Sequence, residues 1–370
     1  MKDKKRISIL IVVLILVVGA ISYLESMKAG SGAGGPTIDA NASSTVHSAN
    51  YAINKLQYPA AKELVSPDGY INTGGVSTTL ASLIGKKVIL LDFWTYSCIN
   101  CQRTIPYLNA WYQKYKDSGL VIIGVHTPEF DFEKNYNNVS AAVKQFGIQY
   151  PVVMDSNYLT WNAYGNEYWP EEYLIDIDGL VRENNIGEGN YQQTETTIQK
   201  LLAERNQALG STSTIPTGFV SATQADNANS PETYFDWQRN QYLGNGSQGV
   251  AGEQTFTRPS TINPNTLYLV GNWNIEDQFA ENGEADDRII YKYNAQNVYF
   301  VASSLPGVTL TVLRDGIPVT TERGADVSAS STVTIQAPRL YKLIQESQAG
   351  THTLELIIHG PKLDAYTFTF

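Results

Sequence analysis

Hydrophobic positions between residues 56 and 209 fall into short continuous runs that alternate with segments of helical spacing. A continuous apolar run indicates a buried strand, whereas apolar positions three or four residues apart indicate one face of a helix. Strands are predicted at 87–94, 120–125, 150–154, 172–177 and 180–183, and helices from residue 98 onward, at 139–146 and at 194–208. This alternation, with a hairpin turn at Asp178-Gly179, predicts an α/β domain whose mixed sheet has helices on both faces.

The pattern changes after residue 232, where strand-like segments follow one another with short gaps. These segments are 266–270, 288–293, 298–302, 309–313, 332–335, 353–358 and 365–370. Several alternate polar and apolar residues, and Asp315-Gly316 is typical of a tight turn between antiparallel strands. We therefore expect an all-β sandwich over 232–370. Residues 210–231 are rich in Ser, Thr, Ala and Asn, which indicates a linker between two domains.

The first 55 residues differ from both domains. Residues 7–24 form an uncharged, largely apolar run, and residues 1–6 before it carry four basic groups and one acidic group. As a helix this run would be about 27 Å long, close to the thickness of a bilayer core. We expect a transmembrane anchor at 7–24 with the basic stub in the cytoplasm, and a flexible tether at 25–55. A cleaved signal peptide is the alternative, although its apolar run would be shorter.

Charge and composition narrow the possible partners. The chain has a formal net charge of −10, so its body would repel the phosphates of nucleic acids. Two cysteines and four scattered histidines do not supply the usual ligands of a structural zinc ion. We therefore expect no nucleic-acid partner, no metal and no cofactor.

Cys98 and Cys101 are the only cysteines and directly follow the predicted strand at 87–94. The order strand, Cys-x-x-Cys, helix is typical of thioredoxin-like redox sites. Amide groups at the start of a helix lack intrahelical partners, so we expect them to stabilise a thiolate at Cys98. A static disulfide would close too small a loop to stabilise the fold much, and haem attachment would need a histidine where Gln102 stands. The motif therefore predicts thiol–disulfide exchange.

Several blocks of sequence resemble the thioredoxin-like part of DipZ-type proteins, which are relatives of the broader TlpA group. The blocks are Asp92-Phe-Trp-Thr-Tyr-Ser-Cys-Ile-Asn-Cys101 with the residues up to Leu108, Gly124-Val-His-Thr-Pro-Glu-Phe130, Trp169-Pro170 before Tyr173-Leu-Ile-Asp176, Pro231-Glu-Thr-Tyr234, and Pro338-Arg-Leu-Tyr341 with the C-terminal strand. The resemblance runs from about residue 64 to the C-terminus. It implies a thioredoxin-like fold, a reversible disulfide between Cys98 and Cys101, and a C-terminal jelly-roll sandwich resembling carbohydrate-binding modules. DipZ-type proteins also carry a multi-span membrane domain that passes electrons across the bilayer. We expect a separate membrane electron donor here.

The resemblance also implies roles for individual residues. Cys98 would attack a substrate disulfide, and Cys101 would resolve the mixed disulfide. Asp92 has the spacing of the buried acid of thioredoxins and would accept the proton of Cys101, unless its carboxylate lies in solvent at a strand end. Pro170 resembles the cis-proline that faces the cysteines, with an ordinary trans turn proline as the alternative.

Aromatic residues near the motif are candidates for substrate contact. Trp94, Tyr96 and Trp169 are expected to crowd the surface around the cysteines, where the Trp169 backbone would pair with an extended peptide. Core or rim packing is the alternative for each. In the C-terminal domain, Trp237 and Trp273 could form a sugar-stacking face for a glycan, although aromatic residues of sandwiches usually lie in the core.

His126 and Glu129 follow the second strand and either approach the cleft or lie in a surface loop, and Arg103 is expected to face solvent. The sequence thus predicts a membrane-anchored, extracytoplasmic thiol–disulfide oxidoreductase that reduces disulfides of exported proteins. A disulfide-forming oxidase would use the same cysteines, and a module that binds glycan or protein is a further alternative. A peroxiredoxin-like peroxidase is disfavoured, because Cys98 lacks the Pro-x-x-x-Thr-x-x-Cys context.

Overall fold

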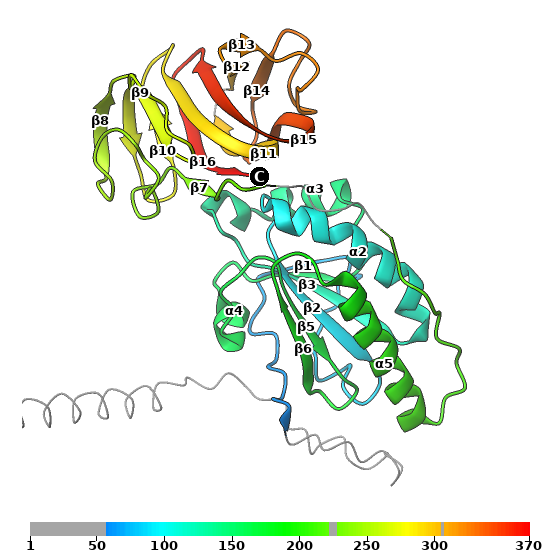
Figure 1. Ribbon diagram of the computed structural model, residues 1–370. Helices are drawn as coiled ribbons and strands as arrows, with labels where there is room; N and C mark the ends of the chain where they lie inside the picture. The colour runs from blue at the N-terminus through cyan, green and yellow to red at the C-terminus, as the bar shows by residue number, and fades with distance from the viewer. Residues whose placement is uncertain (1–56, 222–227, 305–306) are drawn as a thin grey trace, which may run out of the picture.

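A computed structural model of the chain describes residues 57–221, 228–304 and 307–370. They form an α/β domain and a C-terminal β domain that lie against each other (Figure 1). The predicted anchor at 7–24 and tether at 25–55 lie outside the described residues. Within the described ranges, no helix has both the length and the apolar character needed to cross a bilayer.

The α/β domain is built on one mixed sheet of six strands. The strands are β1 (Gly69–Ile71), β2 (Val88–Trp94), β3 (Leu120–His126), β4 (Val152–Met154), β5 (Glu171–Ile175) and β6 (Val181–Ile186), in the spatial order β1-β4-β3-β2-β5-β6. β2, β3 and β4 are parallel, and the other pairs are antiparallel. Every residue of β2 is buried, because this strand is central and both faces of the sheet are covered. The strand predicted at 87–94 is confirmed.

Helices cover both faces of this sheet, as the alternating pattern predicts. They are α2 (Ile99–Tyr115), α3 (Tyr136–Gln145), α4 (Leu159–Tyr164) and α5 (Tyr191–Leu209), with short 3-10 turns η3 (Lys116–Ser118) and η4 (Asp131–Lys134). Side chains of α2, α3 and α5 share one hydrophobic cluster with one face of the sheet. On the other face, Trp161 of α4 packs with residues between Ala61 and Ile84. α2 therefore lies on one face of the sheet, next to β3, with the Cys-x-x-Cys motif at its start.

The C-terminal domain is an antiparallel β structure. Its strands are β7 (Thr233–Tyr234), β8 (Gly252–Phe256), β9 (Leu267–Ile275), β10 (Ala280–Asn282), β11 (Arg288–Ser304), β12 (Val308–Arg314), β13 (Ile317–Pro318), β14 (Thr332–Ile335), β15 (Arg339–Ile358) and β16 (Leu363–Thr369). The segments predicted separately at 288–293 and 298–302 are one strand, β11, which continues through a register shift after Ala295. The beginning of β11 pairs with β9 and its end with β16. The strands thus form one hydrogen-bonded sheet of ten strands, rather than two separate sheets, around a single core.

The two domains meet beside the Cys-x-x-Cys motif. Ile99 lies in a buried cluster that spans both domains, and its other members are Phe130, Tyr299, Val301, Leu340 and Tyr366. The Tyr96 hydroxyl donates a hydrogen bond to the carbonyl oxygen of Pro338 at 3.1 Å. The C-terminal domain therefore covers one side of the motif.

Candidate active site

Cys98 lies at the start of α2, as the sequence predicts. It is the N-cap residue, and its Sγ accepts a hydrogen bond from the backbone N–H of Cys101 at 3.3 Å. Both cysteines are free thiols, but Cys98 is half-buried whereas Cys101 is only 1% exposed. A solvent-accessible thiol at a helix start, one turn before a buried thiol, is the arrangement that thiol–disulfide exchange requires.

Trp169 and Pro170 lie beside Cys98. The peptide bond between them is cis, as predicted. The Cys98 thiol donates to the carbonyl oxygen of Trp169 at 3.7 Å. The half-buried indole of Trp169 packs on Trp161 with ring centroids 4.3 Å apart and donates to the carbonyl oxygen of Thr127. The Trp169 backbone is therefore held next to the accessible sulfur.

Asp92 lies within the sheet under α2 and is 1% exposed. Neither of its carboxylate oxygens has a hydrogen-bond partner, and burial raises its pKa to about 8. Burial also raises the pKa of the Cys101 thiol, and the neighbouring Cys98 and Asp92 raise it further. The alternative in which the Asp92 carboxylate lies in solvent is wrong, because β2 is covered on both faces. The site thus pairs a protonated thiol with an acid that titrates near neutral pH.

Two further buried acids, Glu172 and Glu133, lie near the motif. Glu172 lies on β5 directly opposite Asp92 and is 3% exposed. Glu133 of η4 is fully buried and binds the loop before Cys98: it accepts hydrogen bonds from the Ser97 backbone N–H at 3.2 Å and from the Ser97 hydroxyl at 2.6 Å. The sequence signal for Glu172 is weak, because this residue follows Glu171 at the start of an apolar run and lacks the spacing to Cys98 that identified Asp92.

Trp94 and Tyr96 do not lie on an exposed surface beside the cysteines. Trp94 is fully buried, and Tyr96 is 5% exposed because it reaches into the contact between the domains. The ring of His126 lies between them, stacked on Tyr96 and edge-on to Trp94. Burial lowers the pKa of His126 to about 3, so its imidazole is neutral at physiological pH. Of the three aromatic candidates, Trp169 alone is more than marginally exposed.

The expectation that Arg103 faces solvent is wrong, and so is the surface-loop alternative for Glu129. Arg103 forms an ion pair with Glu188 at 3.0 Å, and its guanidinium lies over the ring of Tyr299 at 5.6 Å. Glu129 forms an ion pair with Arg239 at 2.8 Å. Tyr299 and Arg239 belong to the C-terminal domain. The sequence near the motif does not reveal that this domain lies over it.

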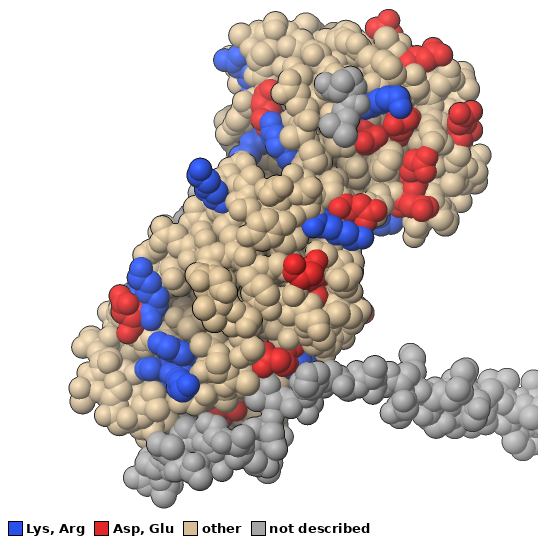
Figure 2. All heavy atoms as spheres, turned by 180° about the vertical axis from the view of Figure 1, so that it is seen from behind, with Lys and Arg blue, Asp and Glu red and all other residues tan. Residues whose placement is uncertain are grey.

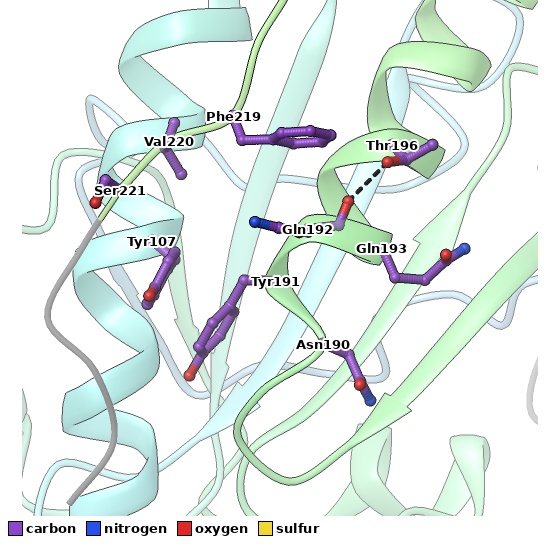
Figure 3. Close-up of a pocket in the computed structure, with 9 residues that line it drawn as sticks. All are labelled: Tyr107, Asn190, Tyr191, Gln192, Gln193, Thr196, Phe219, Val220 and Ser221. Carbon is purple, nitrogen blue, oxygen red and sulfur yellow. Dashed lines mark hydrogen bonds between the residues drawn. The ribbon is translucent and has the colours of Figure 1, made fainter.

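Other surfaces lack redox groups. A cavity of about 740 Å³ lies between α2, the start of α5 and the linker, lined by Tyr107, Tyr191 and Phe219 among others, but by neither cysteine (Figure 3).

The two tryptophans considered for sugar stacking in the C-terminal domain differ in exposure. Trp273 is 1% exposed in the core and cannot stack on a sugar, whereas the indole N–H of half-buried Trp237 donates a hydrogen bond to Asp277. On the face shown in Figure 2, acidic side chains gather over the C-terminal domain.

Comparison with known proteins supports a role of Cys98 and Cys101 in thiol–disulfide exchange. Residues 59–184 match the AhpC/TSA family, and residues 230–370 match the family described as thioredoxin like C-terminal domain. The chain is 39% identical over 311 residues to Protein DipZ from Mycobacterium tuberculosis, which covers 84% of this chain and 42% of that protein. It is also 37% identical over 128 residues to thiol-disulfide oxidoreductase ResA from Bacillus thuringiensis, covering 34% of this chain and 70% of ResA.

A third relative, thiol-disulfide oxidoreductase YkuV from Bacillus subtilis, is 29% identical over 150 residues, which is 40% of this chain and 98% of YkuV. The chain spans less than half the length of Protein DipZ. The match to ResA covers most of that enzyme, and the AhpC/TSA match includes both cysteines. The chain is thus a homologue of Protein DipZ and belongs to the thioredoxin-like thiol–disulfide oxidoreductases.

Proposed function

We propose that this oxidoreductase reduces disulfides of exported proteins outside the cytoplasm while residues 7–24 anchor it in a membrane. The observation that carries the redox role is the contrast between the two sulfurs: Cys98 is accessible at the start of α2, and Cys101 is buried over Asp92. The first sulfur is suited to meet a protein substrate. The second is suited to react only within the enzyme.

In the reductive direction, the Cys98 thiolate attacks one sulfur of a substrate disulfide. A bond forms between Cys98 and that sulfur, and the other substrate sulfur leaves as a thiolate, which takes a proton from water. Cys101 then gives its proton to Asp92 and attacks Cys98, which releases the second substrate thiolate. The substrate gains two electrons, and the Cys98–Cys101 pair loses two. A separate membrane protein would supply the electrons that reduce the enzyme again.

Substrate would bind as an extended segment along Trp169, whose backbone lies next to the Cys98 sulfur. The C-terminal domain covers Ile99, the residue after Cys98, so substrate would approach from the Trp169 side. A glycan at the C-terminal domain gains no support from Trp273, which is buried.

The direction of the reaction is tested by a reduction-potential titration of the Cys98–Cys101 pair together with insulin-disulfide reduction. A reductase should have a potential below about −200 mV, near the range of thioredoxin and glutaredoxins, and should reduce insulin. A potential near about −120 mV, the value of a strong oxidant, would instead identify a disulfide-forming enzyme. Cys98→Ser serves as the control, and insulin reduction that survives this change would remove the cysteines from the activity.

The proposed location needs its own test. In intact cells, a maleimide that cannot cross membranes should label Cys98 of the Cys101→Ser variant, because this thiol is accessible and would lie outside the cytoplasm. Release of the protein by carbonate washing of membranes would contradict the anchor, and labelling only after lysis would contradict the extracytoplasmic location.

A further inference from the structure

Asp92 and Glu172 face each other across two central strands. They are directly opposite partners in the antiparallel pair β2–β5, so both side chains lie on the same face of the sheet. They are 1% and 3% exposed. Both oxygens of Asp92 and one oxygen of Glu172 have no hydrogen-bond partner. Two carboxyl groups are thus buried side by side with little to stabilise their charges.

The groups around this pair carry no positive charge. The charge of Asp92 raises the pKa of the Cys101 thiol on α2 and that of the Tyr150 hydroxyl just before β4. The Tyr150 hydroxyl has no hydrogen-bond partner. Asn185 and Glu183 of β6 face Glu172. The charge of Glu172 also raises the pKa of the Tyr191 hydroxyl on α5. No ammonium, guanidinium or imidazolium group is among these neighbours. The adjacent Glu171 differs, because its carboxylate accepts hydrogen bonds from Tyr173 and Asn184.

Opposite residues of an antiparallel pair have Cβ atoms about 5 Å apart. At that distance, in a buried site whose named neighbours carry no positive charge, two ionised carboxylates repel strongly, so one proton is retained. Burial and the charge of Asp92 both raise the pKa of Glu172 well above its ordinary value. When Asp92 loses its proton, Glu172 therefore keeps its own.

We propose that Asp92 and Glu172 act as one carboxyl pair whose singly protonated form takes the proton of Cys101 during resolution of the mixed disulfide. The S–H bond of Cys101 breaks and its proton joins the pair. The Cys98–Cys101 bond forms while the bond from Cys98 to the substrate sulfur breaks, and that sulfur leaves as a thiolate. The doubly protonated pair then returns one proton to solvent. Asp92 is the carboxyl whose charge acts on the Cys101 thiol, and Glu172 can hold the proton in its place. This step is part of thiol–disulfide exchange in either direction, so it rests on the redox role and not on the proposed direction or location.

The test is stopped-flow reaction of the reduced enzyme with 5,5′-dithiobis(2-nitrobenzoate), which releases one coloured thiolate when Cys98 attacks and a second when Cys101 resolves the adduct. In the unchanged enzyme the second phase should quicken as pH rises, with a midpoint near pH 8, where Asp92 titrates. Asp92→Asn should keep a second phase that quickens with pH, because Glu172 then remains as the acid. The double variant Asp92→Asn with Glu172→Gln should resolve at least about tenfold more slowly than Asp92→Asn alone at pH 8. The first phase should stay within about twofold throughout. If Asp92→Asn and the double variant have the same second-phase profile at every pH, Glu172 takes no part.

Unfolding at equilibrium provides a second readout that does not depend on catalysis. Between pH 5 and 7 the folded protein holds a proton on Glu172 that the unfolded chain has lost. The unfolding constant of Glu172→Gln should therefore rise about tenfold less per pH unit than that of the unchanged protein. Glu171→Gln, one residue away on a hydrogen-bonded carboxylate, is the matched control and should keep the original slope. An unaltered slope in Glu172→Gln would overturn the pair.

Discussion

The regions on either side of the Cys-x-x-Cys motif each contain a buried acid, but the two acids have different surroundings. In the Cys98 region (Ser97, Cys98 and Glu133), the Glu133 carboxylate accepts two hydrogen bonds from Ser97 and two more from the backbone N–H groups of Glu129 and Phe130. In the Cys101 region (Asp92, Cys101 and Glu172), no donor reaches Asp92.

Burial alone therefore does not decide the role of a carboxylate. Burial raises the pKa of Glu133, but hydrogen bonds from Ser97 and Phe130 oppose that shift by stabilising the charged form. For Asp92, burial acts unopposed. We therefore interpret Glu133 as an anchor that joins two loops below the accessible thiol, and Asp92 as an acid kept free of partners so that it can exchange a proton.

The largest expected effect concerns the two sulfurs themselves. Cys98→Ser should abolish reduction of a disulfide substrate, because no accessible thiol remains. Cys101→Ser should still attack but should stop at the mixed disulfide, since the resolving sulfur is gone. Mass spectrometry after reaction with 5,5′-dithiobis(2-nitrobenzoate) should show one stable adduct on Cys101→Ser and none on Cys98→Ser. Equal labelling of both variants would contradict the distinction between an accessible and a buried thiol.

The second effect concerns stability in the Cys101 region. The pKa of Asp92 is raised from 3.8 to about 8 in the folded protein, so its contribution to stability is lost as pH rises through this interval. Asp92→Asn removes the need to take up a proton on folding and should stabilise the protein at pH 7 by up to about 4 kcal/mol, at 1.36 kcal/mol per pKa unit. The gain should vanish below about pH 3, where the acid is protonated in both states. Urea unfolding at both pH values measures it, and a variant that is less stable at pH 7 would show that Asp92 has a stabilising partner.

Local pattern was sufficient for the central features of the site. The apolar run at 87–94 predicts the buried strand, and its order with Cys98 and Cys101 predicts the thiol at a helix start; both depend only on neighbouring residues. Helix α4 was missed, because Leu159–Tyr164 has only six residues and no side-chain cap at Tyr158. The first half of β15 was missed because polar residues near 345–351 interrupt the apolar pattern.

The missed features of the site depend on residues far apart in the sequence. Glu172 meets Asp92 only through the register of β2 with β5. Glu133 meets Ser97 only because the loop after β3 folds back below the motif. Arg103 is covered by Tyr299, almost 200 residues later and in another domain. Sequence pattern specifies which residues are buried more readily than it specifies which buried residues meet.

The smallest expected effect concerns the Cys98 region and has the opposite sign from that of Asp92→Asn. Glu133→Gln keeps the size of the side chain but replaces one acceptor oxygen with an NH₂ donor, which would face backbone N–H groups that need an acceptor. Because a buried donor left without an acceptor costs about 1–3 kcal/mol, this variant should be destabilised by that amount at pH 7. Urea unfolding beside Asp92→Asn provides the comparison. If both substitutions stabilise the protein, the four hydrogen bonds to Glu133 do not compensate its burial, and the two regions do not differ in the way inferred from their donors.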